Sequence, residues 1–279
     1  MKSVDFDYAR PADVETAIKL ISDESGTAKI MAGSQSLGPM LNMRLVQPDL
    51  IVDITGIDEL RQFSDNATEL SIGACVTHSD IEDVRVPEVT RGALALVANG
   101  IAYRAVRNRG TIGGSLTHAD PSADWCSMLA AVGARVVLRG PAGERAITVE
   151  DYMLGALEAD LRASEMLVRV VVPKLSPSAR WGYYKSCRKT GEYAHAIGAF
   201  LTDPDRGVSR VVVGATESKP IVLANAASII GDGRAARPID AFDAGAIDRL
   251  IDKAGMTDPL DRQTHVAVLR RAIEQAKPQ

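Results

Sequence analysis

Two short segments combine glycine with hydroxyl side chains in a way that suits anion binding. The first, AGSQS, runs from Ala32 to Ser36 directly after a short apolar stretch, and the second, TIGGS, runs from Thr111 to Ser115. Glycine lets a backbone approach an anion closely, and successive backbone N–H groups can point into one concavity. Taken alone, the first segment fits a plain surface turn better than a phosphate loop. The second fits a tight turn as well as an anion site.

Neither segment matches the common nucleotide-binding motifs. Gly33 and Gly38 have P-loop spacing, but Pro39 follows where that motif requires lysine and then serine or threonine. No GxGxxG pattern lies near the first expected strand, so the dinucleotide-binding motif is excluded as well. Two arginines just before the second segment, Arg107 and Arg109, could still favour an anion there.

Other residues with possible chemistry give weaker signals. His118 and Asp120 lie two positions apart and could suggest acid–base chemistry. The three cysteines, Cys75, Cys126 and Cys187, are far apart and form no CxxC pair. Because an iron–sulfur cluster usually takes four thiolates, we expect no cluster and no metal site on this chain. The cysteines are expected to be reduced thiols of a cytoplasmic protein.

Composition excludes several classes of protein. The chain has 279 residues and a net charge of −4, without the basic excess typical of nucleic-acid binders. Its longest apolar runs, such as Val211 to Ala215, fall far short of the roughly 20 residues that span a bilayer. The first residues lack the apolar core of a secretory signal, so we expect no membrane span and a cytoplasmic location.

The elements that must position these segments divide into three expected subdomains. Over 1–55, apolar residues at helical spacing predict a helix over 11–22, and strands are expected over 29–32 and 50–54. This order predicts a small α/β subdomain.

The middle subdomain is expected over 56–175. Here the sequence predicts helices over 90–106 and 121–132. Strands rich in β-branched residues are expected over 69–74, 135–139 and 166–172.

The C-terminal subdomain is expected over 176–279, and a linker over 173–179, which contains two prolines, spans its boundary with the middle subdomain. Three strands are predicted, over 181–187, 196–202 and 209–215. Two helices follow, over 224–230 and 258–275. Strands first and helices last predict an α+β arrangement.

The two glycine segments together resemble those of a known family. The string RNRGTIGGSLTHADP from Arg107 to Pro121, and GSQSL from Gly33 to Leu37, are similar to the FAD-binding medium subunit of the xanthine dehydrogenase and carbon monoxide dehydrogenase family of molybdenum hydroxylases. The resemblance covers essentially the whole chain. Ser34 stands where the family usually has a second glycine, which puts the local backbone geometry in question.

The resemblance implies a fold, a cofactor and a site. The fold would be the α+β, vanillyl-alcohol-oxidase-like (PCMH-type) FAD-binding fold. In it two α/β subdomains clasp FAD, and a C-terminal α+β subdomain with a small antiparallel sheet follows. The two glycine segments would hold the FAD pyrophosphate from opposite sides, because clustered N–H groups can bind an anion without a metal.

Five further positions match family residues near the cofactor. Ile101 would pack on FAD, unless it is only a helix core residue. Asp124 would contact FAD, and Leu167 would touch it through its backbone. Lys185 would lie next to the flavin ring, and Tyr193, in the segment that would cover the ring, could shield it. The full set implied for FAD binding is Ala32, Gly33, Ser34, Gln35, Ser36, Ile101, Thr111, Ile112, Gly113, Gly114, Ser115, Asp124, Leu167, Lys185 and Tyr193.

The implied function is electron transfer. A large partner would oxidise the substrate at its molybdenum cofactor, and a small partner with [2Fe–2S] clusters would pass the electrons to FAD on this chain. An external acceptor such as NAD, oxygen or a quinone would take them. The family commonly assembles as a dimer of heterotrimers. No catalytic residue is expected here, so His118 would be structural or lie near the cofactor.

Two alternatives belong to other classes. One is a stand-alone FAD-dependent oxidoreductase on the same scaffold, which would need its own substrate pocket. The other is an assembly subunit that has lost its cofactor. Activity without partners distinguishes the first, and flavin absorbance distinguishes the second.

Overall fold

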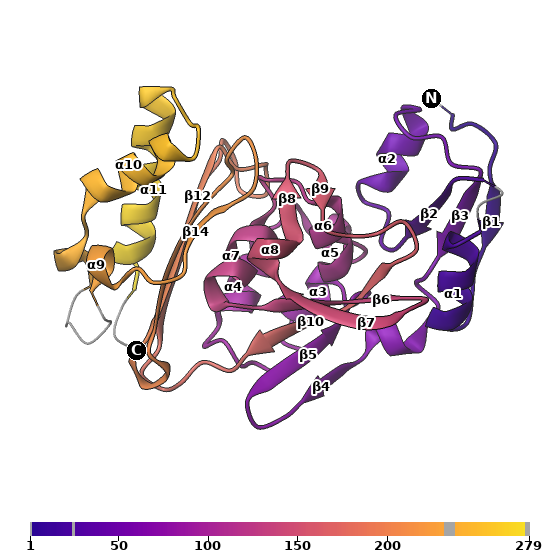
Figure 1. Ribbon diagram of the computed structural model, residues 1–279, viewed down its shortest axis with the longest axis horizontal. Coiled ribbons are helices and arrows are strands. Elements are labelled where there is room, and N and C mark those ends of the chain that lie inside the picture. Colours follow the sequence, from indigo (N-terminus) through magenta and orange to yellow (C-terminus); the bar gives the residue numbers. More distant parts are fainter. Residues whose placement is uncertain (1, 24–25, 232–237, 277–279) are drawn as a thin grey trace.

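The computed structural model describes residues 2–23, 26–231 and 238–276, and its chain passes from one end of the molecule to the other in sequence order (Figure 1). Among the described residues, no helix has both the length and the apolar character needed to cross a membrane. The same part of the chain has no group of three histidine, cysteine, aspartate or glutamate side chains arranged to hold a metal ion.

The N-terminal part is a three-stranded parallel sheet in the order β1-β3-β2, formed by β1 (Asp7–Ala9), β2 (Ala28–Met31) and β3 (Leu50–Asp53). Helix α1 (Val14–Ile21) begins at Asp13, whose carboxylate accepts from the N–H of Thr16, so the helix is shorter than the predicted 11–22. A second helix, α2 (Leu37–Asn42), was not predicted.

The middle part contains a five-stranded antiparallel sheet in the order β4-β5-β10-β6-β7. A short 3-10 helix, η1 (Asp58–Arg61), precedes it. Strand β10 is the central strand, and seven of its positions were predicted, including the run of buried valines. The strands are β4 (Phe63–Asp65), β5 (Glu69–Gly73), β6 (Arg135–Gly140), β7 (Gly143–Thr148) and β10 (Met166–Pro173).

Short helices pack beside this sheet, and α7 (Asp124–Val132) is buried along its whole length. The predicted helix over 90–106 is wrong as one element, because α4 (Ala93–Asn99) ends at Gly100 and α5 (Arg104–Arg107) starts anew. The remaining elements are α3 (His78–Glu82), α6 (Ile112–His118), α8 (Val149–Tyr152), β8 (Met153–Gly155) and β9 (Glu158–Ala159).

The C-terminal sheet is antiparallel in the order β11-β12-β13-β14, with helices on both faces. Helix α11 (Pro259–Glu274) packs on β11 and β12, while α7 packs on β12 and β13. Figure 1 shows the sheet between these two layers. The strands are β11 (Arg180–Ser186), β12 (Ala196–Asp203), β13 (Val208–Gly214) and β14 (Ile221–Leu223).

The remaining C-terminal helices are η2 (Pro204–Arg206), α9 (Ala227–Ile230), η3 (Pro238–Ala241) and α10 (Ala244–Lys253). Glycines permit the close approach of α11 to the sheet. A Cβ atom built on Gly182 would lie 1.9 Å from the carbonyl oxygen of Ala272, so no larger residue fits there.

The division of the chain into three subdomains, near 55 and 175, stays a prediction from the sequence.

Candidate functional site

The two glycine segments, 79 positions apart in the sequence, lie against each other in the structure. A Cβ atom built on Gly33 would lie 1.8 Å from the carbonyl oxygen of Arg109, so the backbones are in direct contact at this point. A Cβ atom on Gly114 would lie 3.8 Å from the Cβ of Ala32. The family resemblance implied this proximity. Residue types and spacing alone do not show it, because it depends on how the first sheet docks on the middle part.

The first segment presents backbone N–H groups that have no acceptor in the part of the chain that the structure describes. Gly38 donates to the carbonyl of Ser34 and the Gln35 side chain to that of Gly33, but among the described residues no hydrogen bond is donated by the N–H groups of residues 33–36. Ser34 has the left-handed φ of +60°. Left-handed residues in such a run help turn successive N–H groups toward one side, as in known anion-binding loops.

The second segment is built differently from the first. It is the start of helix α6, and Thr111 is the N-cap. The N–H of Ile112 donates to Val76, that of Gly113 to Ala74, and those of Gly114 and Ser115 to Thr111. The backbone donors of residues 112–115 are therefore already used within the protein, and their contribution to a ligand must come from shape and from the hydroxyl of Ser115.

The glycines of the second segment have separate roles. Gly113 is buried, and a Cβ atom there would lie 2.6 Å from the Cβ of Ala74, so this glycine permits close packing of α6. Gly114 is exposed on the side that faces Ala32. The sequence suggested that the nearby Arg107 could favour a bound anion at this segment, but its partner is a carboxylate of the protein itself. The side chain of Arg107 is buried and paired with Glu82.

A second group of predicted residues forms a buried ion pair. Asp124 begins α7, and Lys185 reaches it from β11 with its Nζ 2.9 Å from Oδ1. The same ammonium donates to the carbonyl of Gly100 at 2.9 Å, and the Tyr183 hydroxyl donates to Asp124 at 2.7 Å. Burial raises the pKa of Asp124, against the lowering effects of Lys185 and Tyr183. The sequence showed each predicted residue singly but not the pair.

Three predicted positions lie around this pair and α6. Ile101 follows α4 and forms a β-bridge with Gly191, so the segment 187–195 lies against it. Tyr193 in that segment is 69% exposed. Leu167 has its side chain in the core, but the ladder of β10 with β5 starts only at Arg169, which leaves one backbone edge of Leu167 without a β5 partner.

The two groups are linked through α6, which packs on α7. The first residue of α7 is Asp124, while the start of α6 meets the loop after β2. One continuous set of elements therefore joins the uncommitted N–H groups of 33–36 to the Asp124–Lys185 pair. His118 is the last residue of α6 and is partly exposed.

Residues 4–175 match the family of FAD-binding domains in molybdopterin dehydrogenases. The chain belongs to this family. The medium chain of carbon monoxide dehydrogenase from Hydrogenophaga pseudoflava is 34% identical over 78% of this chain and 76% of its own length. The nicotine 6-hydroxylase medium subunit of Paenarthrobacter nicotinovorans is 35% identical over 76% of this chain and 75% of its own length.

The similarity extends to solved structures. Quinoline 2-oxidoreductase from Pseudomonas putida 86 superposes with a TM-score of 0.82 and 32% identity over 99% of this chain and 98% of that chain. These findings confirm the α+β, PCMH-type fold, the cofactor FAD and the family expected from the glycine segments. This member of the FAD-binding family is an electron-transferring oxidoreductase subunit of a molybdenum hydroxylase. Both named relatives are medium subunits, so the family works within multi-subunit enzymes.

The backbone of residues 33–36 in this FAD-binding subunit fits the pyrophosphate of a bound dinucleotide. The glycine at 33 leaves no side chain between the two segments, and the four adjacent N–H groups lack acceptors among the described residues. Buried or partly buried N–H groups are rarely left unpaired without a ligand or water. A pyrophosphate supplies the oxygens that these donors require.

Ser34 of this subunit offers a test of backbone strain. A left-handed conformation costs a residue with a Cβ roughly 1–2 kcal/mol, whereas glycine adopts it freely but loses more entropy on folding. We expect Ser34→Gly to raise the free energy of unfolding by about 0.5–1 kcal/mol, measured by urea denaturation. Ser36→Gly is the control, because Ser36 has an ordinary φ of −105° and its replacement should destabilise. Equal effects of the two changes would contradict the strain argument.

His78, which the sequence analysis did not single out, is buried behind the second segment. Its Nδ1 accepts from the Trp125 indole at 3.1 Å, and burial lowers its pKa to about 4. The pKa of His78 in the folded protein lies below its ordinary value. The neutral imidazole therefore contributes fully to the free energy of unfolding above pH ~6.5, and this contribution is lost as the pH falls toward 4. The full loss is about 3 kcal/mol.

We therefore expect the free energy of unfolding to fall less for His78→Asn than for the parent when the pH is lowered from 6.5 to 4. Asparagine keeps an acceptor for Trp125 but does not titrate. Urea unfolding at both pH values measures the difference. Parallel pH profiles for the two proteins would show that His78 is not the group responsible.

Proposed function

We propose that the N–H groups of residues 33–36 hold the FAD pyrophosphate, with the start of α6 closing the other side. The observation that carries this proposal is the direct contact of the two glycine segments beside four uncommitted donors. Ser36 and Ser115 add hydroxyl groups on the two sides. Gln35 is held in place by its side-chain bond to the carbonyl of Gly33.

The flavin end of FAD is proposed to lie at the Asp124–Lys185 pair, with Ile101, Leu167 and Tyr193 around it. FAD, when bound, supplies a centre that accepts and releases one or two electrons. The ammonium of Lys185 favours negative charge gained there, because a fixed cation in a poorly solvated site is little screened. Asp124 and the carbonyl of Gly100 fix the position of that ammonium.

The complete enzyme is proposed to contain two further kinds of subunit. A large subunit with the molybdenum cofactor would oxidise the substrate, and a small subunit with [2Fe–2S] clusters would deliver the electrons. The names of the relatives, as medium chains, support this division. Those relatives are named for carbon monoxide and nicotine, so we assign substrate choice to the large partner. A dimer of heterotrimers is the proposed assembly.

We also propose a cytoplasmic location and an external electron acceptor. The three cysteines of the described residues are free, which suits a reducing compartment. The acceptor, whether NAD, oxygen or a quinone, would receive electrons at the flavin end, near the exposed Tyr193.

The test is to purify the chain alone, record its visible spectrum and quantify the FAD that it releases. Flavin absorbance with FAD near one per chain, and no turnover without partners, is the expected result. A colourless chain that takes up no added FAD would overturn the proposed site and favour an assembly subunit. Turnover by the lone chain would favour the stand-alone oxidoreductase.

A further inference from the structure

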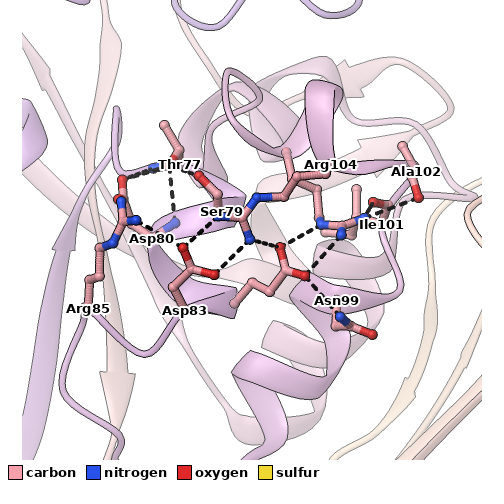
Figure 2. A network of polar contacts seen from close by, with 11 residues as sticks. Thr77, Ser79, Asp80, Asp83, Arg85, Asn99, Ile101, Ala102 and Arg104 are labelled. Carbon is pink, nitrogen blue, oxygen red and sulfur yellow. Dashed lines mark hydrogen bonds and ion pairs between the residues drawn. The ribbon is translucent and has the colours of Figure 1, made fainter.

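One buried arginine holds the irregular segment between α4 and α5. Arg107 donates from Nη1 to the carbonyl of Ile101 at 2.9 Å and to that of Ala102 at 3.2 Å. Its Nε and Nη2 bond to the two carboxylate oxygens of Glu82 at 2.7 and 2.9 Å. Figure 2 shows these carbonyls at one end of the polar network. All three nitrogens of the planar guanidinium are thus engaged, in a two-pronged pair and two carbonyl bonds.

The ion pair between Arg107 and Glu82 is buried and held on several sides. The side chains of Arg107 and Glu82 are only 10% and 11% exposed. The hydrogen bond from Arg107 holds the pKa of Glu82 below its usual range, so the pair stays ionised at neutral pH. Glu82 is also held by the amide of Asn99 at 2.9 Å.

The segment that Arg107 holds carries contacts to two proposed flavin neighbours. The carbonyl of Gly100 accepts from Lys185 at 2.9 Å. Ile101 bridges to Gly191, and a Cβ atom on Gly191 would lie 2.2 Å from the carbonyl oxygen of Ala102. The segment 187–195, here called the covering segment, therefore rests directly on this backbone.

Ala102 shows that the backbone is constrained. Its φ of +43° is left-handed, a conformation that a residue with a Cβ adopts at a cost and keeps only when its surroundings fix it. The bond from Arg107 to its carbonyl and the close contact with Gly191 supply that constraint.

We propose that Arg107, fixed by Glu82, is a positioning residue that sets the flavin end of the site. It holds residues 100–102 in the shape on which both Lys185 and the covering segment depend. The inference rests on the proposed function, in which this end faces the flavin. Arg107 itself touches neither the ammonium of Lys185 nor the covering segment by any hydrogen bond of the described residues.

The chain offers a matched control on the same short helix. Arg104 bonds to the same Glu82 at 2.8 Å and to Asp83 at 2.6 Å, as Figure 2 shows for Asp83. It is 45% exposed and makes no hydrogen bond to residues 100–102 among the described residues. Arg104→Gln therefore removes an arginine from the same network without touching the segment.

The first experiment uses the FAD-free chain and trypsin. Arg188 and Lys189 are exposed cleavage sites within the covering segment. We expect Arg107→Gln to raise the rate of cleavage there about tenfold, because proteolysis follows the population of the opened segment. Arg104→Gln should match the parent, and Arg107→Lys, which keeps a cation beside Glu82, should restore part of the protection.

The second experiment uses the FAD-loaded chain. Arg107→Gln should retain FAD through the separate pyrophosphate segments, while quenching of flavin fluorescence by iodide increases several-fold. A folded Arg107→Gln protein with parental trypsin cleavage and parental iodide quenching would overturn the proposal. Equal increases in cleavage and quenching in Arg104→Gln would also overturn the proposal, because any loss of an arginine from the network would then have the same effect.

Gly191→Ala keeps the proposal testable if Arg107→Gln does not fold. Its φ of +89° and its contact with Ala102 mean that a methyl group must push the covering segment away from the backbone of Ala102. It should reproduce the faster cleavage, and parental cleavage in Gly191→Ala would count against the proposal. A parent chain that binds no FAD would overturn the proposed function, yet the trypsin comparison on the FAD-free protein would still decide this inference.

Discussion

Gly33→Ala is expected to weaken FAD retention by about 100-fold, or ~2.7 kcal/mol, while leaving a folded protein. The new Cβ would lie 1.8 Å from the carbonyl oxygen of Arg109 and 2.5 Å from its carbonyl carbon. Both atoms are backbone, so the loop after β2 must move away from the start of α6. That movement separates the four uncommitted N–H groups from the opposite wall of the proposed pyrophosphate site.

The measurement is FAD released per chain, together with the affinity of the FAD-free protein for added FAD. Gly38→Ala is the matched control, because its nearest neighbour is the movable Ser34 hydroxyl at 3.1 Å. It should bind FAD like the parent. If Gly33→Ala bound FAD as tightly as Gly38→Ala, the pyrophosphate could not lie between the two segments.

Lys185→Met should lower the free energy of unfolding by about 3–5 kcal/mol, because it leaves the carboxylate of Asp124 buried without its cation. Both side chains are about one tenth exposed, so water cannot replace the lost partner. The variant should also raise the pKa of Asp124 further. In the FAD-loaded chain we expect a lower flavin reduction potential, because the cation that favours added negative charge is gone.

A double-mutant cycle with Asp124→Asn separates these effects. Asparagine keeps an acceptor for the Tyr183 hydroxyl but carries no charge. The double variant should therefore recover much of the stability lost in Lys185→Met, while the flavin potential stays low. A double variant no more stable than Lys185→Met would mean that the buried charge is not the cause.

The sequence predicted the long elements well, for identifiable reasons, and the cofactor segments stay a prediction. Strand β10 was visible as a run of β-branched residues, and α11 was predicted over 258–275, within one residue of its observed ends. The family resemblance located Asp124 and Lys185 individually. Their ion pair joins α7 to β11, and only the tertiary fold brings these elements together.

The failures have physical causes as well. Glycines disfavour helix, so the start of α6 looked like a turn; the packing of Gly113 on Ala74 outweighs that local preference. The break between α4 and α5 was hidden because Ile101 continues the apolar spacing of α4 while pairing instead with Gly191. Arg107 looked like an anion ligand because sequence spacing does not reveal its partner Glu82.

The order of the middle sheet has a consequence for how the chain is made. Its central strand, β10, is the last of the five to be synthesised, so β5 and β6 each wait with an unpaired edge until residues 166–173 have left the ribosome. Pairings between strands so distant in sequence close slowly, and open edges invite association with other chains. Chaperone protection during synthesis would therefore matter most between the completion of β7 and the arrival of β10, before the two glycine segments have a stable sheet behind them.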